Sequence, residues 1–329
     1  MFLGMDLEDE AFSGTDTMSK ATKALIDRWK TPEMTRLAHL IISNLHRSQS
    51  LALPGLGVIN GRLDLRGLTF PPRSFAAGNS SFDNVDLSWT KFCLPTFNNC
   101  SFNKCIFDYA DLSSLRQWNS NYSECSFRET NFSNASFGAH GGIYLRCIFD
   151  EAKFTRAIFI RPRFEHCVFN KCKLKGVDFN GCSFVKCKFV GVLEDVQFHG
   201  HYGVPYGEEI FGPALPNLMT NVDFSEASLR MVGFHDQCDL STVILPNDRN
   251  HILIKNFSKV IQAAEQEYQK ISDKEIIFGR KVWLSTLKSL SINQDMYIVN
   301  KQDLAEKEGN RFAEYFIGLL KRYELKFSS

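Results

Sequence analysis

The 329-residue sequence lacks any run of about 18 or more apolar residues, so we expect no membrane-spanning helix. Residues 1–16 carry acids at positions 6, 8, 9 and 10 and no early basic cluster, which is not the pattern of a secretory signal. The formal net charge is only +1, so no overall charge draws the chain to nucleic acid or to an acidic partner. These absences predict a cytoplasmic protein whose ten cysteines are reduced thiols.

Motifs that would carry a reaction are also absent. The sequence has no Gly-rich phosphate loop, no His-Glu-x-x-His motif, and no Ser-His-Asp or Cys-His arrangement that predicts a nucleophile. The histidines between His199 and His235 match no zinc motif in their spacing. Pairs such as Cys167 and Cys172 are five residues apart, whereas zinc ligands usually lie about two to four apart. We therefore predict a protein that is not an enzyme and that holds no cofactor and no metal.

Phenylalanine, in contrast, is abundant, with 29 residues. Such enrichment suggests a slot that recurs and takes the same kind of side chain each time. From Phe82 a large residue recurs every five positions as far as Phe137, and after two extra residues the spacing resumes at Tyr144 and runs to Phe189. Of these 22 positions, 21 are Phe, Leu or Tyr, and only Gln117 is polar. Neither a helix nor a strand has a period of five.

A second column of small or modest residues lies two positions before most of the large ones. Its members are Val85, Cys100, Cys105, Ala110, Cys125, Ala135, Cys147, Ala152, Ala157, Cys167, Cys172, Val177, Cys182 and Cys187. The pairing of columns is foreshadowed by Leu63/Leu65 and returns between Val222 and Leu245. Nine of the ten cysteines fall in this column, so we expect them to pack as small apolar side chains.

A solenoid explains both columns. Each five-residue unit forms one side of a square coil, with its large residue and the preceding small one pointing inward. Four units of five give a coil of about 20 residues, and coils stack about 4.8 Å apart. Residues 20 apart then lie above one another, so Phe149, Phe169 and Phe189 should form one internal ladder.

The order of a small residue, a polar residue, Leu or Phe, and two polar residues resembles the pentapeptide-repeat family. Cys167–Gly176 and Asn221–Arg230 show it clearly, and the resemblance covers about residues 60–247. It implies a mainly β fold, a right-handed quadrilateral parallel β-helix, and a bacterial source. It implies no single function, because one fold hosts many roles.

The remaining segments predict the domain organisation. We expect a flexible N-terminus over 1–16, a helical cap over 17–59 that Pro32 divides into two helices, and the β-helix over 60–247. Residues 248–329 are expected to form three helices, the second capped by Asp273 and the third beginning near Lys301. The cap would cover an open end of the solenoid. The C-terminal helices would either pack on the last coil or pair two copies of the chain.

The repeat is interrupted twice, by the two-residue expansion within 138–143 and by an insertion over 199–220. Loops that project from a regular scaffold often carry function, so Tyr202, Tyr206 and Phe211 are candidate interaction residues. The alternative is a packed excursion that covers the rod with Phe211, Leu215 and Leu218.

Charge marks a second candidate surface. Residues 146–188 hold ten Lys/Arg and four Asp/Glu, a balance of 10 − 4 = +6. The 20-residue stacking places Arg146, His166 and Lys186 in one outward column, and Lys153 and Lys173 in another. These columns are either a solvated face or a strip that binds an anionic partner.

We therefore expect a non-enzymatic scaffold that binds an unidentified protein through the rod surface, the 199–220 loop or the C-terminal helices. The family resemblance implies an alternative, a topoisomerase-modulating mimic of DNA with acidic faces. The 18 Lys/Arg and 19 Asp/Glu of residues 60–247 do not favour it. Further alternatives are binding of nucleic acid or an anionic surface by the basic coils, for which the balanced charge gives little support, and an enzymatic or toxin-like role of the C-terminal region.

Overall fold

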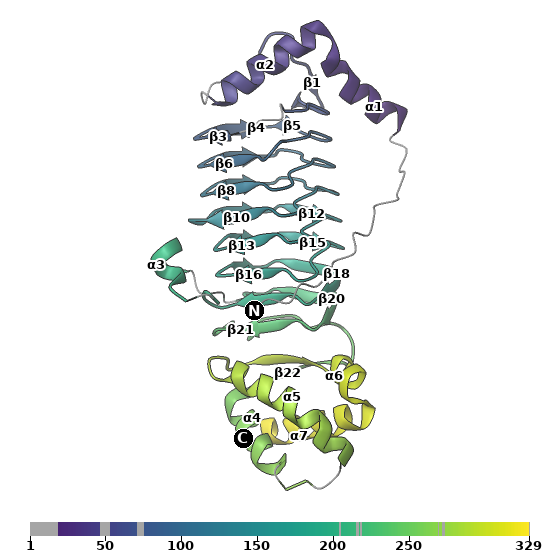
Figure 1. Ribbon diagram of the computed structural model, residues 1–329, viewed down its shortest axis with the longest axis vertical. Coiled ribbons are helices and arrows are strands. Elements are labelled where there is room, and N and C mark those ends of the chain that lie inside the picture. Colours follow the sequence, from purple (N-terminus) through teal and green to yellow (C-terminus); the bar gives the residue numbers. More distant parts are fainter. Residues whose placement is uncertain are drawn as a thin grey trace, which may run out of the picture.

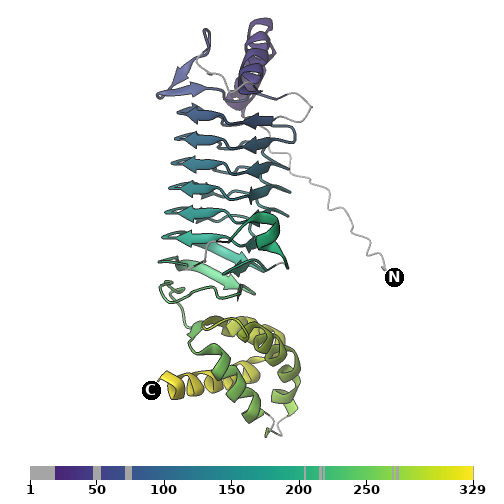
Figure 2. The same cartoon turned by 90° about the vertical axis from the view of Figure 1, so that its left-hand side faces the viewer.

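A rod of stacked coils lies between a helical cap at the N-terminal end and a mainly helical module at the C-terminal end (Figure 1, Figure 2). The computed structural model describes residues 19–46, 53–70, 76–203, 205–214, 217, 219–268, 270–271 and 274–328. The flexible N-terminus expected over 1–16 lies outside these residues.

The rod has four faces, which we number in the order in which each coil passes through them. Face 1 is a parallel sheet of β4 (Ser81–Asp83), β7 (Ser101–Asn103), β9 (Asn121–Ser123), β11 (Ile143–Leu145), β14 (Arg163–Glu165) and β17 (Ser183–Val185). Face 2 contains β2 (Arg62–Asp64), β5 (Val85–Asp86), β12 (Ile148–Asp150), β15 (Val168–Asn170), β18 (Lys188–Glu194) and β20 (Asp223–Arg230).

Face 3 is held mainly by single bridges, such as the one between Lys153 and Lys173. Face 4 is a parallel sheet of β3 (Ala76–Gly78), β6 (Thr96–Asn98), β8 (Arg116–Trp118), β10 (Ser136–Ala139), β13 (Ile158–Ile160), β16 (Asp178–Asn180), β19 (Gln197–His199) and β21 (Gly233–His235).

The register of the strands confirms the predicted ladder. Phe149 pairs with Phe169, and Phe169 with Phe189, in parallel strands. Their rings stack with centroids 4.8 and 4.7 Å apart, and all three side chains are buried. Cys167 is buried beside this ladder, in the small column, as expected.

Each coil turns its corners with residues in the left-handed backbone region. Asn79, Asn99 and Asn119 occupy successive corners between faces 4 and 1, with φ of 51°, 51° and 41°. Asparagine tolerates this conformation better than most residues. Their side chains form a ladder of their own, with Nδ2–Oδ1 distances of 3.3 and 2.9 Å, which ties neighbouring coils together.

Gln117, the one polar residue in the large column, is buried with a partner. Its Oε1 accepts a hydrogen bond from the hydroxyl of Tyr144 at 2.5 Å, and its Nε2 donates to the carbonyl of Ser120 at 3.4 Å. A buried amide is tolerated when its polar atoms are bonded in this way. The exception in the sequence is therefore one half of a buried polar pair.

The N-terminal cap consists of α1 (Lys20–Asp27), the 3-10 helix η1 (Arg28–Lys30) and α2 (Pro32–His46). Ser19 caps α1, because its Oγ accepts a hydrogen bond from the backbone N–H of Thr22 at 3.1 Å. Pro32 begins α2, as the sequence predicts. The buried Trp29 donates from Nε1 to the carbonyl of Arg66 in the first coil at 2.7 Å. The short strand β1 (Val58–Ile59) then pairs antiparallel with β2.

The C-terminal module contains α4 (Phe257–Tyr268), α5 (Lys274–Ser291), α6 (Lys301–Glu308) and α7 (Asn310–Ser328). The expectation that residues 248–329 form three helices is wrong in two places. Residues 251–254 and 297–300 form the antiparallel strands β22 (His251–Ile254) and β23 (Tyr297–Asn300). The expected third helix is two helices, because Gly309, with φ of 90°, ends α6. The predicted cap, Asp273, lies outside the described residues.

Polar contacts dock this module on the last coil. The buried carboxylate of Asp303 accepts from Arg230 Nε at 2.8 Å and from the backbone N–H of Met231 at 2.7 Å. Asn300 Nδ2 donates to the carbonyl of Leu229 at 2.6 Å. The apolar core is continuous from the N-terminal cap through the rod to α7.

Candidate interaction surface

The insertion replaces one corner of one coil. β19 ends at His199 on face 4, and the chain returns at Thr220, which bridges Val185 on face 1. Between these points the insertion turns back along the edge between faces 4 and 1, toward the N-terminal end of the rod. Arg161, at the corner two coils earlier, donates from Nη1 to the carbonyl of Phe211 at 2.9 Å.

The base of the insertion is packed tightly. Asn217 is buried, and its Oδ1 accepts from the backbone N–H of Phe184 at 3.1 Å. A Cβ on Gly200 would lie 2.2 Å from the carbonyl oxygen of Asp236, so glycine is needed there for close approach. The ring of Tyr202 covers Gly181, and its hydroxyl donates to the carbonyl of Gly212 at 3.0 Å.

The sequence left a packed excursion as the alternative to a projecting loop, and the base of the insertion is packed in this way. Tyr202 is half-buried and bonded within the insertion, and Phe211 is half-buried beside it, with ring centroids 6.0 Å apart. Leu215 and Leu218, also expected to pack here, lie outside the described residues. The remaining short helix, α3 (Gly207–Phe211), projects from the rod (Figure 1).

The second interruption lies on the same edge. The expanded corner over 138–143 distorts the register of β10 against β8 and leads into β11 on face 1. Gly138 has φ of 76°, and a Cβ there would lie 2.8 Å from Pro162 Cδ, one coil further along. We call the surface formed by residues 138–143, 161–162 and the described part of 200–214 the insertion edge. Both breaks in the repeat are thus at one edge of the rod.

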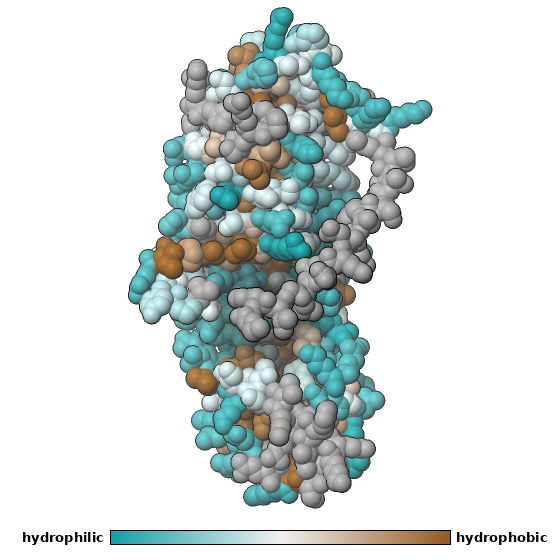
Figure 3. Space-filling view, in the orientation of Figure 1, coloured by the Kyte–Doolittle hydropathy of each residue, from teal (hydrophilic) through white to brown (hydrophobic). Residues whose placement is uncertain are grey.

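Apolar side chains are exposed along this edge and beside it. Tyr206 and Ile210 of the insertion are 72% and 60% exposed. Ile158 on face 4 is 56% exposed, and Ile143 on face 1 is 43% exposed. Figure 3 shows a hydrophobic band that runs from the α3 side partway across the visible face of the rod. Exposed apolar patches on a rigid scaffold often mark interaction sites.

His199, at the start of the insertion, is paired with two carboxylates. His199 is bonded through Nδ1 to Asp236 at 2.7 Å and through Nε2 to Asp178 at 3.1 Å. Burial lowers the pKa of His199, but the hydrogen bonds to the two carboxylates outweigh it, so the pKa is raised. His235 stacks on this ring, at 5.0 Å between centroids, and burial together with the nearby His199 lowers its pKa.

Neither a metal centre nor a membrane span is found in the described part of the chain. No group of three His, Cys, Asp or Glu side chains there has the arrangement of a metal site. Among the described helices, none is both long and apolar enough to cross a bilayer.

The structure separates the basic residues that the sequence grouped. Arg146, His166 and Lys186 occupy successive corners between faces 1 and 2, with φ of 51°, 54° and 52°. Arg146 is paired there with Glu124, at 3.0 Å. Lys153 and Lys173 are bridge partners on face 3. The two columns are therefore separated by face 2 and do not form one strip.

The insertion edge lies at one border of face 1, and the Arg146 column lies at the other. The insertion edge does not border face 3. The structure places Tyr202, Tyr206 and Phe211 in the insertion, and it exposes Ile143 and Ile158 on the adjoining faces 1 and 4, which sequence reasoning missed. Counting on in steps of 20 from the corner at Asn119 would have placed residues 138–143 and 199–220 at the same corner.

Stacked parallel coils with inward aromatic ladders define a repeat protein of the β-helix class, and the predicted fold class is confirmed. Residues 147–191 match the family described as pentapeptide repeats, in eight copies. This part of the rod is therefore built of pentapeptide repeats, as the resemblance in the sequence implies.

No curated protein matches the sequence. Several solved structures are similar in part. HetL, a pentapeptide repeat protein involved in heterocyst differentiation regulation in the cyanobacterium Nostoc sp. strain PCC 7120, is 14% identical with a TM-score of 0.33, and the match covers 57% of this chain and 89% of HetL. QnrB1, a plasmid-mediated fluoroquinolone resistance protein, is 18% identical with a TM-score of 0.24, over 53% of this chain and 91% of QnrB1.

Rfr23 from the cyanobacterium Cyanothece 51142 is 10% identical with a TM-score of 0.20, over 55% of this chain and 87% of Rfr23. All three are pentapeptide-repeat or resistance proteins by description, but identities and TM-scores this low assign no function to this chain.

Proposed function

We propose that the protein is a non-enzymatic scaffold that binds a protein partner, and that the insertion edge is the surface that contacts it. The observation that carries the proposal is the coincidence of both breaks in the repeat at one edge. An otherwise regular rod departs from its pattern there and exposes Tyr206 and Ile210.

The rod supports such a role because its surface is held rigidly from within. The ladders fix the coils on both sides of the edge, and the bonds from Arg161 and Tyr202 hold the insertion against them, so little conformational entropy is lost when a partner docks. Large apolar side chains in the centre of an interface usually supply most of its binding free energy. Ile210 and Tyr206 have this character, and the exposed Glu208 and Glu209 beside them would lie at the rim.

Other surfaces remain secondary proposals. The column of Arg146, His166 and Lys186 borders the same face 1 and would favour acidic groups on the partner. Pairing of two copies through the C-terminal helices is a further proposal. We also propose a bacterial source and a cytoplasmic location. The ten free thiols accord with a reducing compartment.

The charge layout does not favour a mimic of DNA. At the successive corners between faces 1 and 2 a neutral residue, a base and an acid precede the basic column, so no long acidic column forms there. Several acids instead bond to the rod itself, as Asp111 does to the backbone N–H of Ser113 at 3.1 Å. We therefore do not propose a topoisomerase as the partner, although the capture experiment described next would detect one.

The proposal is tested by affinity capture from a lysate of the source organism, using the full chain and two matched variants. Ile210→Asp places a charge on the insertion edge. Leu94→Asp places the same charge on an equally exposed apolar residue, 57% exposed, at a corner between faces 3 and 4. A protein retained by the native chain and by Leu94→Asp, but lost with Ile210→Asp, supports the proposal.

Loss of a hot-spot anchor typically weakens binding by about 2 kcal/mol or more, or about 30-fold. Equal capture by the two variants would show that the edge is not the site. Recovery of nucleic acid alone, released by moderate salt, would move the function to the basic coils.

A further inference from the structure

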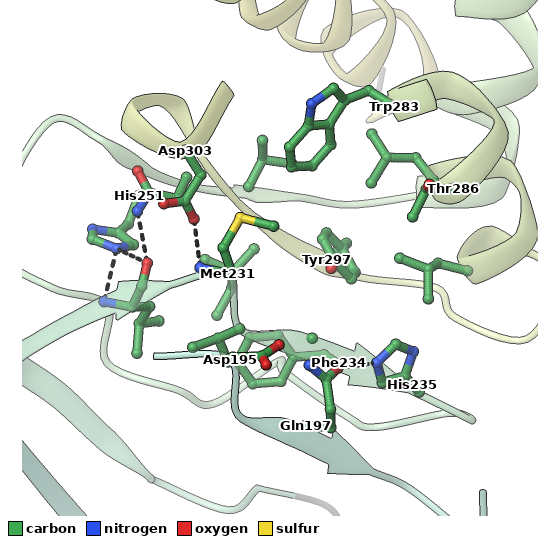
Figure 4. Close-up of a pocket in the computed structure, with 18 residues that line it drawn as sticks. Asp195, Gln197, Met231, Phe234, His235, His251, Trp283, Thr286, Tyr297 and Asp303 are labelled. Atoms are coloured by element: carbon green, nitrogen blue, oxygen red, sulfur yellow. Dashed lines mark hydrogen bonds between the residues drawn. The ribbon is translucent and has the colours of Figure 1, made fainter. Parts of the chain in front are cut away.

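A cavity of about 200 Å³ separates the last coils from the C-terminal module. Strands β19 and β21 form its floor, β23 one side and α5 its roof. Figure 4 shows Trp283 and Thr286 of α5 across the cavity from Phe234, His235 and Gln197, with Tyr297 between them. The cavity is part of neither the insertion edge nor the basic columns.

The walls are mainly apolar and aromatic. Phe234 and Tyr297 meet edge to face, with centroids 6.4 Å apart. Phe257 stacks behind Tyr297 at 4.9 Å, so the tyrosine ring is fixed in place. Leu287 and Leu290 of α5 complete the lining. Water in such a space would face mostly carbon, whereas a buried water normally needs several polar partners.

One end of the cavity is polar. His235 Nε2 lies 2.6 Å from Gln197 Oε1, so the ring donates to the amide oxygen. This pairing leaves His235 Nδ1 as an acceptor and the Gln197 amide nitrogen as a donor. Neither atom is hydrogen-bonded to another described residue. The buried Nε1 of Trp283, on the α5 side of the cavity, also lacks a partner among the described residues. Burial lowers the pKa of His235, which favours the neutral imidazole.

Glycine at position 233 keeps this end open. A Cβ on Gly233 would lie 2.0 Å from Gln197 Oε1 and 2.3 Å from His235 Nε2. Any side chain there would displace the polar pair. The opposite end is clamped by Asp303, which bonds to Arg230 and to the backbone of Met231. The cavity is therefore bounded by groups that are fixed in position.

We propose that this cavity binds a small, planar, uncharged aromatic molecule that carries a hydrogen-bonding group. The ring would lie among Phe234, Tyr297 and Leu287, and the polar group would bond to His235 and Gln197. The volume suits one ring or two fused rings, because an apolar cavity of about 150 Å³ is enough for benzene. Since the walls come from both modules, the ligand would hold the C-terminal module on the rod.

Indole is a suitable probe, because it has two fused rings and one N–H donor. Isothermal titration calorimetry of the full chain should show saturable binding of one indole. Indene has nearly the same shape without the donor, and it should bind about three- to tenfold more weakly because one hydrogen bond is lost. This comparison needs no variant.

Two tryptophan substitutions locate the site. Thr286→Trp fills the exposed rim of the cavity and should weaken indole binding at least tenfold. Leu325→Trp adds the same side chain to an exposed position on α7 and should leave binding unchanged. Thermal unfolding of both variants checks that they are folded. Ile210→Asp should also bind indole normally, which separates this proposal from that of the insertion edge.

The proposal is overturned if indole shows no saturable binding, or if Thr286→Trp binds it as well as the native chain does. Equal affinities for indole and indene would refute the polar end formed by His235 and Gln197.

Discussion

Truncating one ring in the middle of the ladder tests the fold quantitatively. Phe169 is buried and stacks on Phe149 at 4.8 Å and on Phe189 at 4.7 Å. Phe→Ala in a packed core removes about 3–5 kcal/mol of the free energy of unfolding. Two stacked neighbours place Phe169→Ala in the upper part of this range, at about 4–5 kcal/mol. Each coil contacts only its neighbours, so the defect weakens both adjoining interfaces.

Urea unfolding followed by circular dichroism measures the change. With a slope near 2.5 kcal/mol/M, the midpoint of Phe169→Ala should fall by about 1.5–2 M. Lys171→Asn is the control, because Lys171 is exposed and its left-handed φ of 48° suits asparagine. This variant should stay within about 0.5 kcal/mol of the native chain. Equal midpoints for the two variants would refute the ladder as the source of stability.

Three further outcomes are expected. Gly200→Ala should lower the free energy of unfolding by about 1–3 kcal/mol in urea, because its Cβ would lie 2.2 Å from Asp236 O; an unchanged midpoint would contradict the packed base. Bonds to Asp178 and Asp236 raise the pKa of His199, so the contribution of His199 to the free energy of unfolding should be full below about pH 6.5 and lost as pH rises through the raised pKa. A difference in melting temperature between the native chain and His199→Gln that grows with pH would contradict this. Cys93 is the one cysteine of ten that is not buried, so a thiol reagent should label one thiol quickly in the native protein, and Cys93→Ser should remove that phase; two or more fast thiols would contradict the inward column.

The rod could be predicted from sequence because its contacts lie at fixed separations. A residue in a solenoid meets the one about 20 positions later, so the columns of large and small residues give the register directly. The stacking of Phe149, Phe169 and Phe189 follows from counting alone. Pro32 likewise marked the start of α2.

The C-terminal strands could not be predicted in this way. β22 and β23 are separated by two helices, and each is only four residues long. Pairing between such distant segments leaves no local period in the sequence. Since the flanking segments have helical spacing, the sequence predicts only helices in this region and neither strand. The cavity between this module and the rod depends on the same long-range packing.

The candidate surface was predicted only in part. Composition identified the insertion and its aromatic residues, but not that Tyr202 is packed and Tyr206 is exposed. Side-chain exposure depends on where the insertion turns back, and Arg161 and Gly200 fix that by contacts outside the repeat pattern. The sequence gives no reason for a polar Gln117 in the column of large residues. The structure gives one, because Gln117 accepts a hydrogen bond from a tyrosine 27 positions away.

Site-specific photocrosslinking in cells of the source organism tests the central claim most directly. A benzophenone amino acid replaces Tyr206 on the insertion edge, or Leu94 at a different corner, each in the full chain. The account predicts that position 206 crosslinks to a discrete protein and that position 94 does not. Crosslinking at Leu94 with none at position 206 would contradict the claim that the insertion edge binds the partner.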